Sequence, residues 1–322
     1  MFSCVDHILK LDEVKDSIDF AVNAKRIVCI GVDGPTASGK TVFANLLKKE
    51  IQKISTKNVQ LIPLDGLLIE RTLREKSLLN IKHEGIPFEH EAEIHMRFSK
   101  FEKLLQQVRI NRAVLNFEKE IILENLYSRS NNGKCIGNLK INLTNKTVLI
   151  FEGHYTTRPE FDGVLDRNFI LLSERKELIK RKINRVADYR DQREVEQYFN
   201  LIDEPSYLSN YYRFATHNSL ILDNSDFSKP FSVGYEHINT LLNTHKYLEK
   251  NKIASEKIKE FIFGLHGLSS YSFTDKNNIE KLLFDFNNIE KMESKKTISE
   301  SFLKHKVAHN ICYFDYVSKN EI

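Results

Sequence analysis

The sequence predicts an α/β fold in which helices cover both faces of a parallel sheet, giving a three-layer α/β/α sandwich. Two observations lead to this prediction. Short runs of Val, Ile and Leu recur along the chain, and segments with a helical spacing of apolar residues lie between them. Strands that are buried on both faces read as continuous apolar runs, and their alternation with helices is typical of parallel sheets.

Five apolar runs are expected to form the strands of this sheet. Each is short, continuous and followed by polar or turn-forming residues, as expected for a buried strand. The runs are IVCIGV (27–32), VQLIPL (59–64), TVLIFE (147–152), NFILL (168–172) and SLILD (219–223).

Four segments between these runs predict helices, because their apolar residues recur every three or four positions. The stretch 128–146 is polar and rich in turn-forming residues, so we expect a loop or a small hairpin there. The predicted helices cover residues 40–54, 91–108, 174–189 and 192–201.

The character of the chain changes after Pro230. Residues 231–322 contain neither proline nor arginine, and patterns such as NIEKLLFDFNNIEKM predict a mainly helical C-terminal appendage. The last arginine is Arg213. Arginine is the favoured bidentate ligand of phosphate, so any phosphate chemistry is expected before residue 214.

Composition excludes several classes of protein. Of the 322 residues, 41% are apolar and 29% are charged, as in soluble globular proteins. The formal net charge of +4 is too small to indicate a nucleic-acid-binding protein. No run approaches the ~18 apolar residues of a membrane helix, and the N-terminus lacks the pattern of a signal peptide. We therefore expect no nucleic acid and no membrane as partners.

The cysteines and histidines do not form a recognisable metal or disulfide pattern. The four cysteines are far apart and include no CxxC pair, which favours reduced thiols in a cytoplasmic protein. His90 and His95, in HEAEIH, lie five positions apart. A zinc-protease helix needs two histidines four positions apart on one face, so we reject this pair as metal ligands.

A glycine-rich segment after the first predicted strand fits the Walker A pattern G-x-x-x-x-G-K-[ST]. A buried strand precedes it and a predicted helix follows it, so backbone N–H groups and the helix N-terminus would face the same anion. Lys40 would reach the β- and γ-phosphates of a nucleotide, and Thr41 would bind Mg²⁺. The nucleotide-binding residues are Gly34, Pro35, Thr36, Ala37, Ser38, Gly39, Lys40 and Thr41.

Two acidic residues stand at the ends of other predicted strands. Asp65 follows LIPL, and Glu152 ends LIFE. Ligands of open parallel sheets bind at the carboxyl ends of the strands, so both acids should lie beside the glycine-rich loop. One acid can help to hold Mg²⁺, and the other can accept a proton from an attacking hydroxyl.

An arginine-rich helical segment follows the fourth predicted strand. SERKELIKRKINRVADYRDQREVEQYF includes Arg181 and Arg185. One interpretation is a solvated helix surface. The other, which we favour, is a lid that brings arginines to the charge that develops on a transferred phosphoryl group.

These segments together resemble the uridine kinase/phosphoribulokinase superfamily of P-loop kinases, over roughly residues 25–230. VDGPTASGKTVFANLL is similar to the family's first motif and PLDGLL to its second, while FEGHYTTRPE resembles its strand ending in Glu-Gly. The arginine-rich segment resembles the lid, and LILDN resembles the last core strand. The resemblance implies a nucleoside/nucleotide-kinase-like fold and phosphorylation of an alcohol with ATP and Mg²⁺.

The resemblance also implies roles for individual residues. Asp65 matches the general base, and we expect Lys40, Arg181 and Arg185 to act with it in catalysis. Thr41 and Glu152 are the expected magnesium ligands. We expect the acceptor, a small molecule, to contact Asp65 together with Glu89, Tyr127 and Arg158.

The identity of the acceptor stays open at this stage. The family likeness favours uridine or cytidine, whereas Gly66-Leu67 in the second motif is closer to pantothenate-kinase-like and sugar-kinase-like relatives. A nucleotide-dependent regulatory ATPase, with a C-terminal module that binds a partner, is an alternative of another class. A homo-oligomer is compatible with the sequence.

We therefore expect three parts in the chain. Residues 1–24 form an N-terminal helical segment, 25–230 a P-loop kinase domain, and 231–322 the helical appendage.

Overall fold

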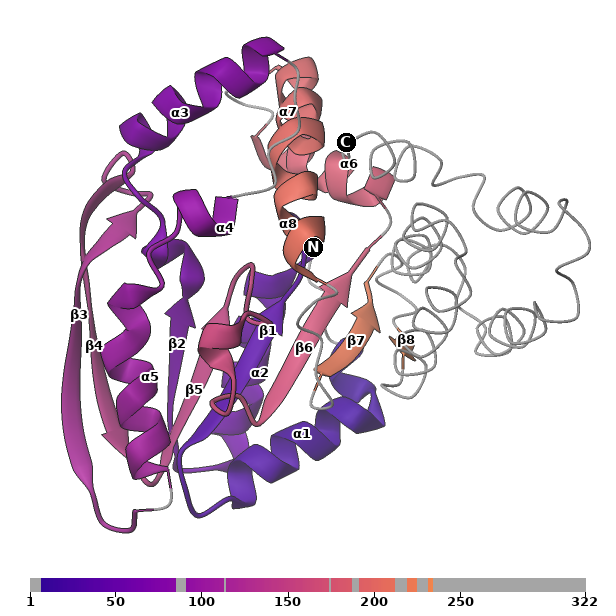
Figure 1. Ribbon diagram of the computed structural model, residues 1–322. Helices are drawn as coiled ribbons and strands as arrows, with labels where there is room; N and C mark the ends of the chain where they lie inside the picture. Colours follow the sequence, from indigo (N-terminus) through magenta and orange to yellow (C-terminus); the bar gives the residue numbers. More distant parts are fainter. Residues whose placement is uncertain are drawn as a thin grey trace, which may run out of the picture.

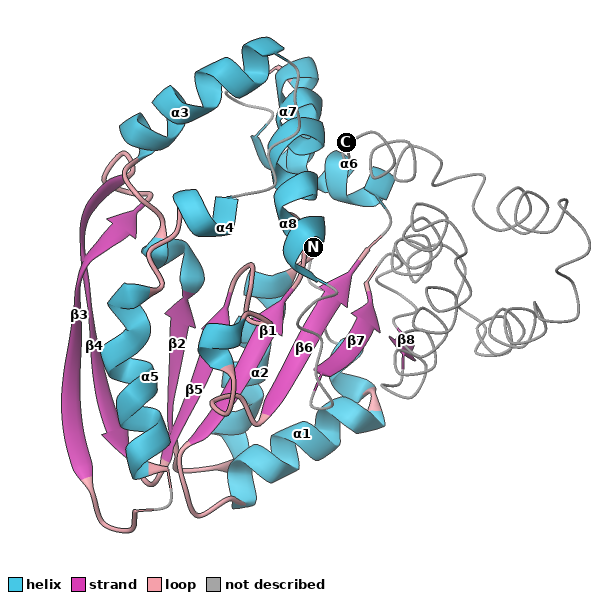
Figure 2. Cartoon of the chain, viewed as in Figure 1, coloured by secondary structure: helices cyan, strands magenta, loops and turns pink. Residues whose placement is uncertain are grey.

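The computed structural model describes residues 7–84, 91–112, 114–173, 175–186, 191–211, 219–224 and 231–233. Its centre is a six-stranded sheet with the strand order β2-β5-β1-β6-β7-β8 (Figure 1). The first five strands in this order are parallel, and β8 pairs with β7 in the antiparallel sense. Helices lie on both faces of the sheet (Figure 2), which confirms the predicted three-layer α/β/α fold.

All five predicted strands are present, each within one residue of its expected bounds. Strand β8 was not predicted and comes from the segment assigned to the appendage. The strands of the sheet are β1 (Val28–Asp33), β2 (Asn58–Pro63), β5 (Thr147–Glu152), β6 (Arg167–Leu172), β7 (Ser219–Asp223) and β8 (Phe231–Val233).

One face of the sheet packs against the two N-terminal helices, α1 (Asp12–Asn23) and α2 (Lys40–Ile54). A short 3₁₀ turn, η1 (Ile8–Lys10), precedes α1. The expected helical character of residues 1–24 is thus present from Ile8 onward. The apolar face of α1 joins the same buried cluster as α2 and the central strands.

The opposite face packs against α5 (Ser99–Asn111) and a two-stranded hairpin. The hairpin consists of β3 (Glu118–Ser128) and β4 (Lys134–Thr144), so it is much longer than the small hairpin that the sequence predicted. Its inward-facing side chains, including Ile121 and Ile141, join the core cluster of this face.

The remaining helices lie near the carboxyl ends of the strands (Figure 1). The predicted helix 91–108 is broken, because Met96 leaves the helical path to form a β-bridge with Leu68. The helix predicted at 192–201 is α-helical only as far as Tyr198, and a π-helical turn from Phe199 to Asp203 follows it. These elements are η2 (Leu64–Leu67), α3 (Arg71–Glu84), α4 (Glu91–Ile94), α6 (Arg175–Val186), α7 (Gln192–Tyr198), η4 (Phe199–Asp203) and α8 (Glu204–Tyr211). The 3₁₀ turn η3 (Pro159–Phe161) lies instead beside the C-terminal part of α5, where Arg109 donates to the carbonyl oxygen of Glu160.

Most of the predicted appendage, residues 234–322, lies outside the described residues. The helical character of the appendage and the domain boundary at 230 therefore remain predictions.

Within the described part of the chain, no helix has the length and apolarity needed to cross a membrane.

Candidate active site

The glycine-rich loop turns sharply between β1 and α2. Gly34 has φ +146°, and a Cβ at this position would lie 2.3 Å from the carbonyl oxygen of Leu171. Gly39 caps the N-terminus of α2 with φ +98°, and Ala37 between them also has a positive φ of 62°. Successive residues of alternating handedness turn their N–H groups toward one concave side, which is how backbone nests bind anions.

The interior of the loop is held by side chains. Nδ2 of Asn224, the residue after β7, donates to the carbonyl oxygen of Ser38 at 2.7 Å. Nζ of Lys40 donates to the carbonyl oxygen of Pro35, also at 2.7 Å. The hydroxyl of Ser38 is fully buried and has no hydrogen-bond partner among the described residues. An unpaired buried hydroxyl beside a concave backbone fits a phosphate group.

Lys40 is buried among acidic residues. Burial lowers the pKa of its ammonium group, while the negative charges of Glu152, Asp33 and Asp65 act in the opposite direction. Three carboxylates thus act electrostatically on the predicted phosphate-binding lysine.

Thr41 and Glu152 meet where α2 begins and β5 ends. The hydroxyl of Thr41 donates to Oε1 of Glu152 at 2.9 Å. Burial raises the pKa of Glu152, against the opposing effects of Lys40 and of the Thr41 hydrogen bond. Hydroxyl and carboxylate oxygens are the ligands that Mg²⁺ prefers, so the chemistry of the pair fits the predicted metal site.

The backbone brings Asp65 toward Glu152. Gly153 follows β5 with φ +155°, and a Cβ there would lie 2.6 Å from Cβ of Leu64. Only glycine therefore allows this close approach of the chain to η2, which carries Asp65. Asp65 also contributes to the raised pKa of Glu152, so the two predicted acids share one site.

Asp65 forms an ion pair with Arg129, which lies in the turn between β3 and β4. Both side chains remain partly exposed. The tip of the hairpin therefore reaches the carboxylate that the sequence predicts as the general base.

A third acid, Asp33, was not predicted from the sequence. It ends β1, is 1% exposed and accepts hydrogen bonds from the N–H of Gly34, the hydroxyl of Thr156 and the N–H of Thr157. Burial raises its pKa, and the hydrogen bond from Thr156 is the largest effect in the other direction. Asp33 thus ties the start of the glycine-rich loop to the segment after β5.

The two predicted catalytic arginines lie on α6 in different environments. Arg181 donates from Nη1 to the hydroxyl of Ser173 at 3.0 Å and from Nη2 to the carbonyl oxygen of Asn224 at 2.8 Å. It thereby supports the asparagine that binds the loop. Arg185 is exposed, and its positive charge lowers the pKa of Lys40.

The pKa of His154 is lowered by burial and by several positive charges of this site. Its pKa lies well below the ordinary value, chiefly because of burial. The charges of Lys40, Arg129, Lys182 and Arg185 lower it further. Cations from the loop, the hairpin and α6 therefore all act on this side chain, which indicates a positive potential suited to a polyanion.

The predicted acceptor residues are only partly brought together. Tyr127 lies on β3, 9% exposed, and its hydroxyl accepts a hydrogen bond of 3.1 Å from Nη2 of Arg74. Glu89 lies outside the described residues, as does His90. Arg158 lies over the ring of Phe98, 4.8 Å from its centroid, and donates to Glu160.

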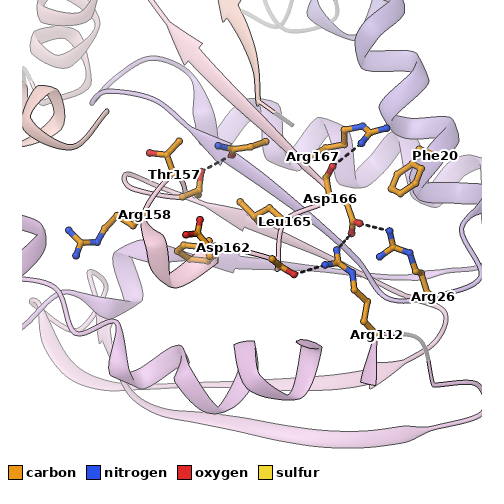
Figure 3. Close-up of a pocket in the computed structure, with 13 residues that line it drawn as sticks. Phe20, Arg26, Arg112, Thr157, Arg158, Asp162, Leu165, Asp166 and Arg167 are labelled. Atoms are coloured by element: carbon orange, nitrogen blue, oxygen red, sulfur yellow. Dashed lines mark hydrogen bonds and ion pairs between the residues drawn. The ribbon is translucent and has the colours of Figure 1, made fainter. Parts of the chain in front are cut away.

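Arg158 also lines a cavity of about 660 Å³ (Figure 3). Arg26, Arg112, Asp166 and Arg167 are among the other residues that line it. The phosphate-binding loop contributes none of the lining residues. A role of Arg158 in acceptor binding stays a prediction.

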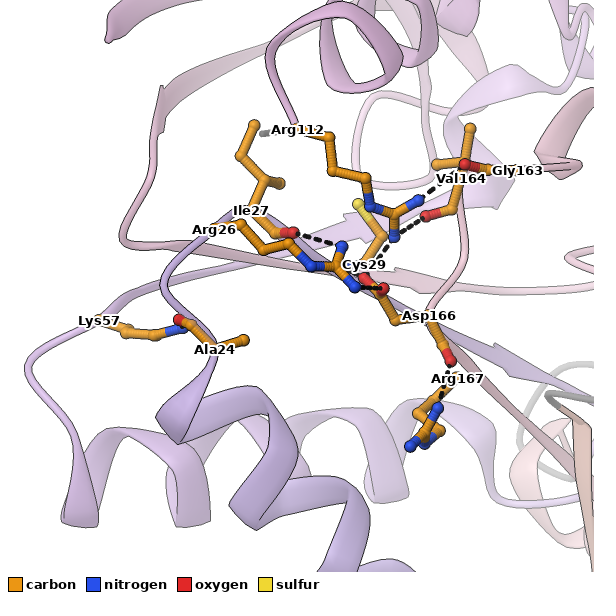
Figure 4. Close-up of polar contacts among 10 residues, drawn as sticks. All are labelled: Ala24, Arg26, Ile27, Cys29, Lys57, Arg112, Gly163, Val164, Asp166 and Arg167. Atoms are coloured by element: carbon orange, nitrogen blue, oxygen red, sulfur yellow. Dashed lines mark hydrogen bonds and ion pairs between the residues drawn. The ribbon is translucent and has the colours of Figure 1, made fainter. Parts of the chain in front are cut away.

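One wall of this cavity is a buried charge cluster centred on Asp166 (Figure 4). Its carboxylate pairs with Arg26 at 2.6 Å and with Arg112 at 2.5 Å, and accepts from the N–H of Cys29 at 2.9 Å. The N–H of Asp166 in turn donates to the carbonyl oxygen of Cys29. The cluster joins β1, β6 and the end of α5, and we interpret it as structural.

Three residues of the site were not found from the sequence. Asp33 and Asn224 both stand at the ends of predicted strands, so the rule that identified Asp65 and Glu152 could have identified them too. Arg129 lies two residues after Tyr127, but no local pattern in the sequence indicates its contact with Asp65.

No protein-family model and no curated protein matches this sequence. Among solved structures, a D-glycerate 3-kinase from Cryptococcus neoformans is similar, with 10% identity over 70% of this chain and 100% of its own, at a TM-score of 0.48. A protein described as a candidate fructose transport system kinase, from Silicibacter sp. TM1040, is 14% identical. The match covers 64% of this chain and 96% of that protein, with a TM-score of 0.47. A candidate uridine kinase from Bacillus stearothermophilus is 21% identical. The match covers 60% of this chain and 95% of that protein, with a TM-score of 0.36. At these values the likenesses carry no argument about activity, which rests on the residues of the site.

Proposed function

We propose that this protein is a kinase that transfers the γ-phosphoryl group of ATP to the hydroxyl of a small molecule. The observation that carries the proposal is the convergence of Lys40, the Thr41–Glu152 pair and Asp65 beside one phosphate-binding loop. A nucleotide switch needs the loop and the metal ligands. A kinase also needs a carboxylate placed to receive the proton of an acceptor.

The donor half of the site consists of the residues from Gly34 to Thr41. The backbone N–H groups of the loop would bind the β-phosphate, and Nζ of Lys40 would exchange the carbonyl oxygen of Pro35 for phosphate oxygens. Thr41 and Glu152 would hold Mg²⁺, which neutralises phosphate charge when it is bound.

The acceptor half begins at Asp65. Its carboxylate would orient the acceptor hydroxyl and take its proton as the oxygen attacks the γ-phosphorus. Arg185 would stabilise the charge of the moving phosphoryl group, since its own charge already acts on Lys40. Arg181 would act indirectly, because it binds Ser173 and Asn224.

For the acceptor, the resemblance in sequence favours uridine or cytidine, and pantothenate or a sugar is the alternative. A screen of these alcohols with MgATP, with ADP release as the signal, tests the proposal. Turnover that depends on an acceptor supports a kinase. ADP release that no acceptor accelerates, together with partner binding that follows the nucleotide state, would instead support the regulatory ATPase.

A further inference from the structure

The tip of the β3–β4 hairpin is anchored on the first turn of α3. The N–H of Arg71 donates to the carbonyl oxygen of Gly133 at 2.9 Å, and its Nη1 donates to Oδ1 of Asn132 at 3.1 Å. Gly133 has φ +75°, and a Cβ there would lie 2.5 Å from Cβ of Arg71. The two segments therefore form one wall, held together by a backbone hydrogen bond.

This wall carries three arginines, Arg71, Arg74 and Arg129, which we call the arginine wall. Arg129 pairs with Asp65, and the guanidinium of Arg74 lies 5.1 Å from the ring centroid of Tyr127. No carboxylate among the described residues forms an ion pair with Arg71 or Arg74. Of the three guanidinium groups, only that of Arg129 has a carboxylate partner among the described residues, and this partner is the proposed base, Asp65.

The charge of Arg74 also acts on His95. The ring nitrogen Nε2 of His95 lies 2.7 Å from the hydroxyl of Ser77, and the ring is fully buried. Burial, with a further contribution from the charge of Arg74, lowers its pKa to about 4. His95 is therefore neutral at physiological pH and adds no charge of its own.

We propose that the acceptor is an alcohol that carries a carboxylate or a phosphate group, and that the arginine wall binds this anion. An acceptor whose hydroxyl reaches Asp65 necessarily lies next to Arg129. An anionic group gives Arg129 a new partner and frees the carboxylate of Asp65. Guanidinium groups bind both carboxylate and phosphate through paired hydrogen bonds.

The inference rests on the proposed function, because it assumes that Asp65 receives the hydroxyl. In the balanced step, the acceptor oxygen forms a bond to the γ-phosphorus while the bond between that phosphorus and the leaving oxygen of ADP breaks. The hydroxyl proton goes to Asp65. Arg129 binds the anionic group throughout and takes no part in the bond changes, so it determines specificity.

Matched pairs of acceptors test the charge requirement. The pairs are pantothenate with panthenol, glycerate with glycerol, and ribose 5-phosphate with ribose. Each compound is tested for ADP release with MgATP, and for an increase in Tm of the full chain in the presence of the non-hydrolysable analogue MgAMP-PNP. The variants are Arg129→Gln, Arg74→Gln and the charge-preserving Arg129→Lys. Lys119→Gln, at the exposed far end of the same hairpin, is the control.

We expect at least one anionic compound to raise the Tm or to release ADP, with its neutral partner weaker by about tenfold or more. Arg129→Gln and Arg74→Gln should weaken the anionic compound by a similar factor, Arg129→Lys by less, and Lys119→Gln not at all. The inference is overturned if neutral partners serve as well as anionic ones, or if no anionic compound is bound or phosphorylated. The donor half of the proposed function is tested separately: the wild type should bind ATP, and Lys40→Ala should abolish this binding.

Discussion

The hydroxyl of Thr41 donates a hydrogen bond of 2.9 Å to Oε1 of Glu152, although the two residues lie 111 positions apart in the sequence. The contact exists because β1 and β5 are neighbouring parallel strands, so that the start of α2 and the end of β5 lie at the same edge of the sheet. The oxygen ligands proposed for Mg²⁺ are thus already in contact within the protein itself.

Replacing Glu152 by glutamine should increase the stability of the fold and decrease the activity. Burial raises the pKa of Glu152 above its ordinary value of 4.5, so the ionised side chain destabilises the folded state at neutral pH. We expect Glu152→Gln to raise the Tm at pH 7.5 and to lower kcat about a hundredfold or more through loss of Mg²⁺ binding.

The gain in Tm should shrink as the pH falls toward 4.5, because the wild-type carboxyl then becomes protonated and its cost disappears. Thermal unfolding from pH 4.5 to 8, without added metal, measures this trend. A lower Tm for Glu152→Gln at pH 7.5 would contradict it.

Replacing Asp65 by asparagine should remove catalysis and leave donor binding in place. The amide of an asparagine could not accept the acceptor's proton, so kcat should fall about 10²–10⁴-fold. Affinity for MgAMP-PNP, measured by calorimetry, should stay within about threefold, because Asp65 lies outside the phosphate-binding loop. Lys40→Ala is the contrasting variant and should lose both nucleotide affinity and turnover. An Asp65→Asn enzyme with wild-type kcat would exclude Asp65 as the base.

Gly153 is expected to tolerate no side chain. A Cβ at this position would lie 2.6 Å from Cβ of Leu64, so Gly153→Ala must displace η2, and with it Asp65. We expect a loss of about 2–3 kcal/mol in unfolding free energy from the clash and the strained φ, together with lower kcat/KM. Gly163→Ala is the control for a positive φ without a clash, since φ there is +69° and no atom lies within 4 Å of the added Cβ. Equal losses for the two variants would contradict an extra cost from the contact with Leu64.

The cluster around Asp166 should stabilise the fold. Asp166→Asn removes the negative charge that two arginines share, and breaking a buried ion pair costs about 3 kcal/mol when its partners keep some exposure. Urea unfolding of this variant should show that loss, whereas Asp162→Asn, at an exposed position nearby, should change stability by less than about 0.5 kcal/mol. Wild-type stability in Asp166→Asn would mean that solvation of the arginines offsets the lost pair.

Local patterns in the sequence were sufficient for the five parallel strands of the sheet and for helix α2, whereas β8 was not predicted. Each buried strand is a continuous apolar run, and α2 spans the 40–54 range predicted from its spacing. The hairpin was underestimated because β4 exposes one face to solvent, so its apolar residues alternate with polar ones and the run looks like a polar loop.

Contacts between distant residues could not be predicted in the same way. Asp65 and Arg129 are 64 positions apart, and their meeting depends on how the hairpin tip rests on α3. The break in the predicted helix 91–108 likewise depends on the bridge between Leu68 and Met96, a tertiary contact that overrides helical spacing.

The burial of Cys29 makes the reactivity of its thiol a measure of how often the core becomes exposed. The thiol lies in β1 at the centre of the sheet with no exposed surface, and burial together with the charge of Asp166 raises its pKa far above the ordinary value. Alkylating reagents attack only an accessible thiolate. Cys29 belongs to the core cluster that α5 and the hairpin cover, so its modification requires this layer to move away from the sheet. Cys135, half-buried in the hairpin, should be modified before Cys29. The ratio of their two rates would compare local opening of the hairpin with exposure of the core beneath α5.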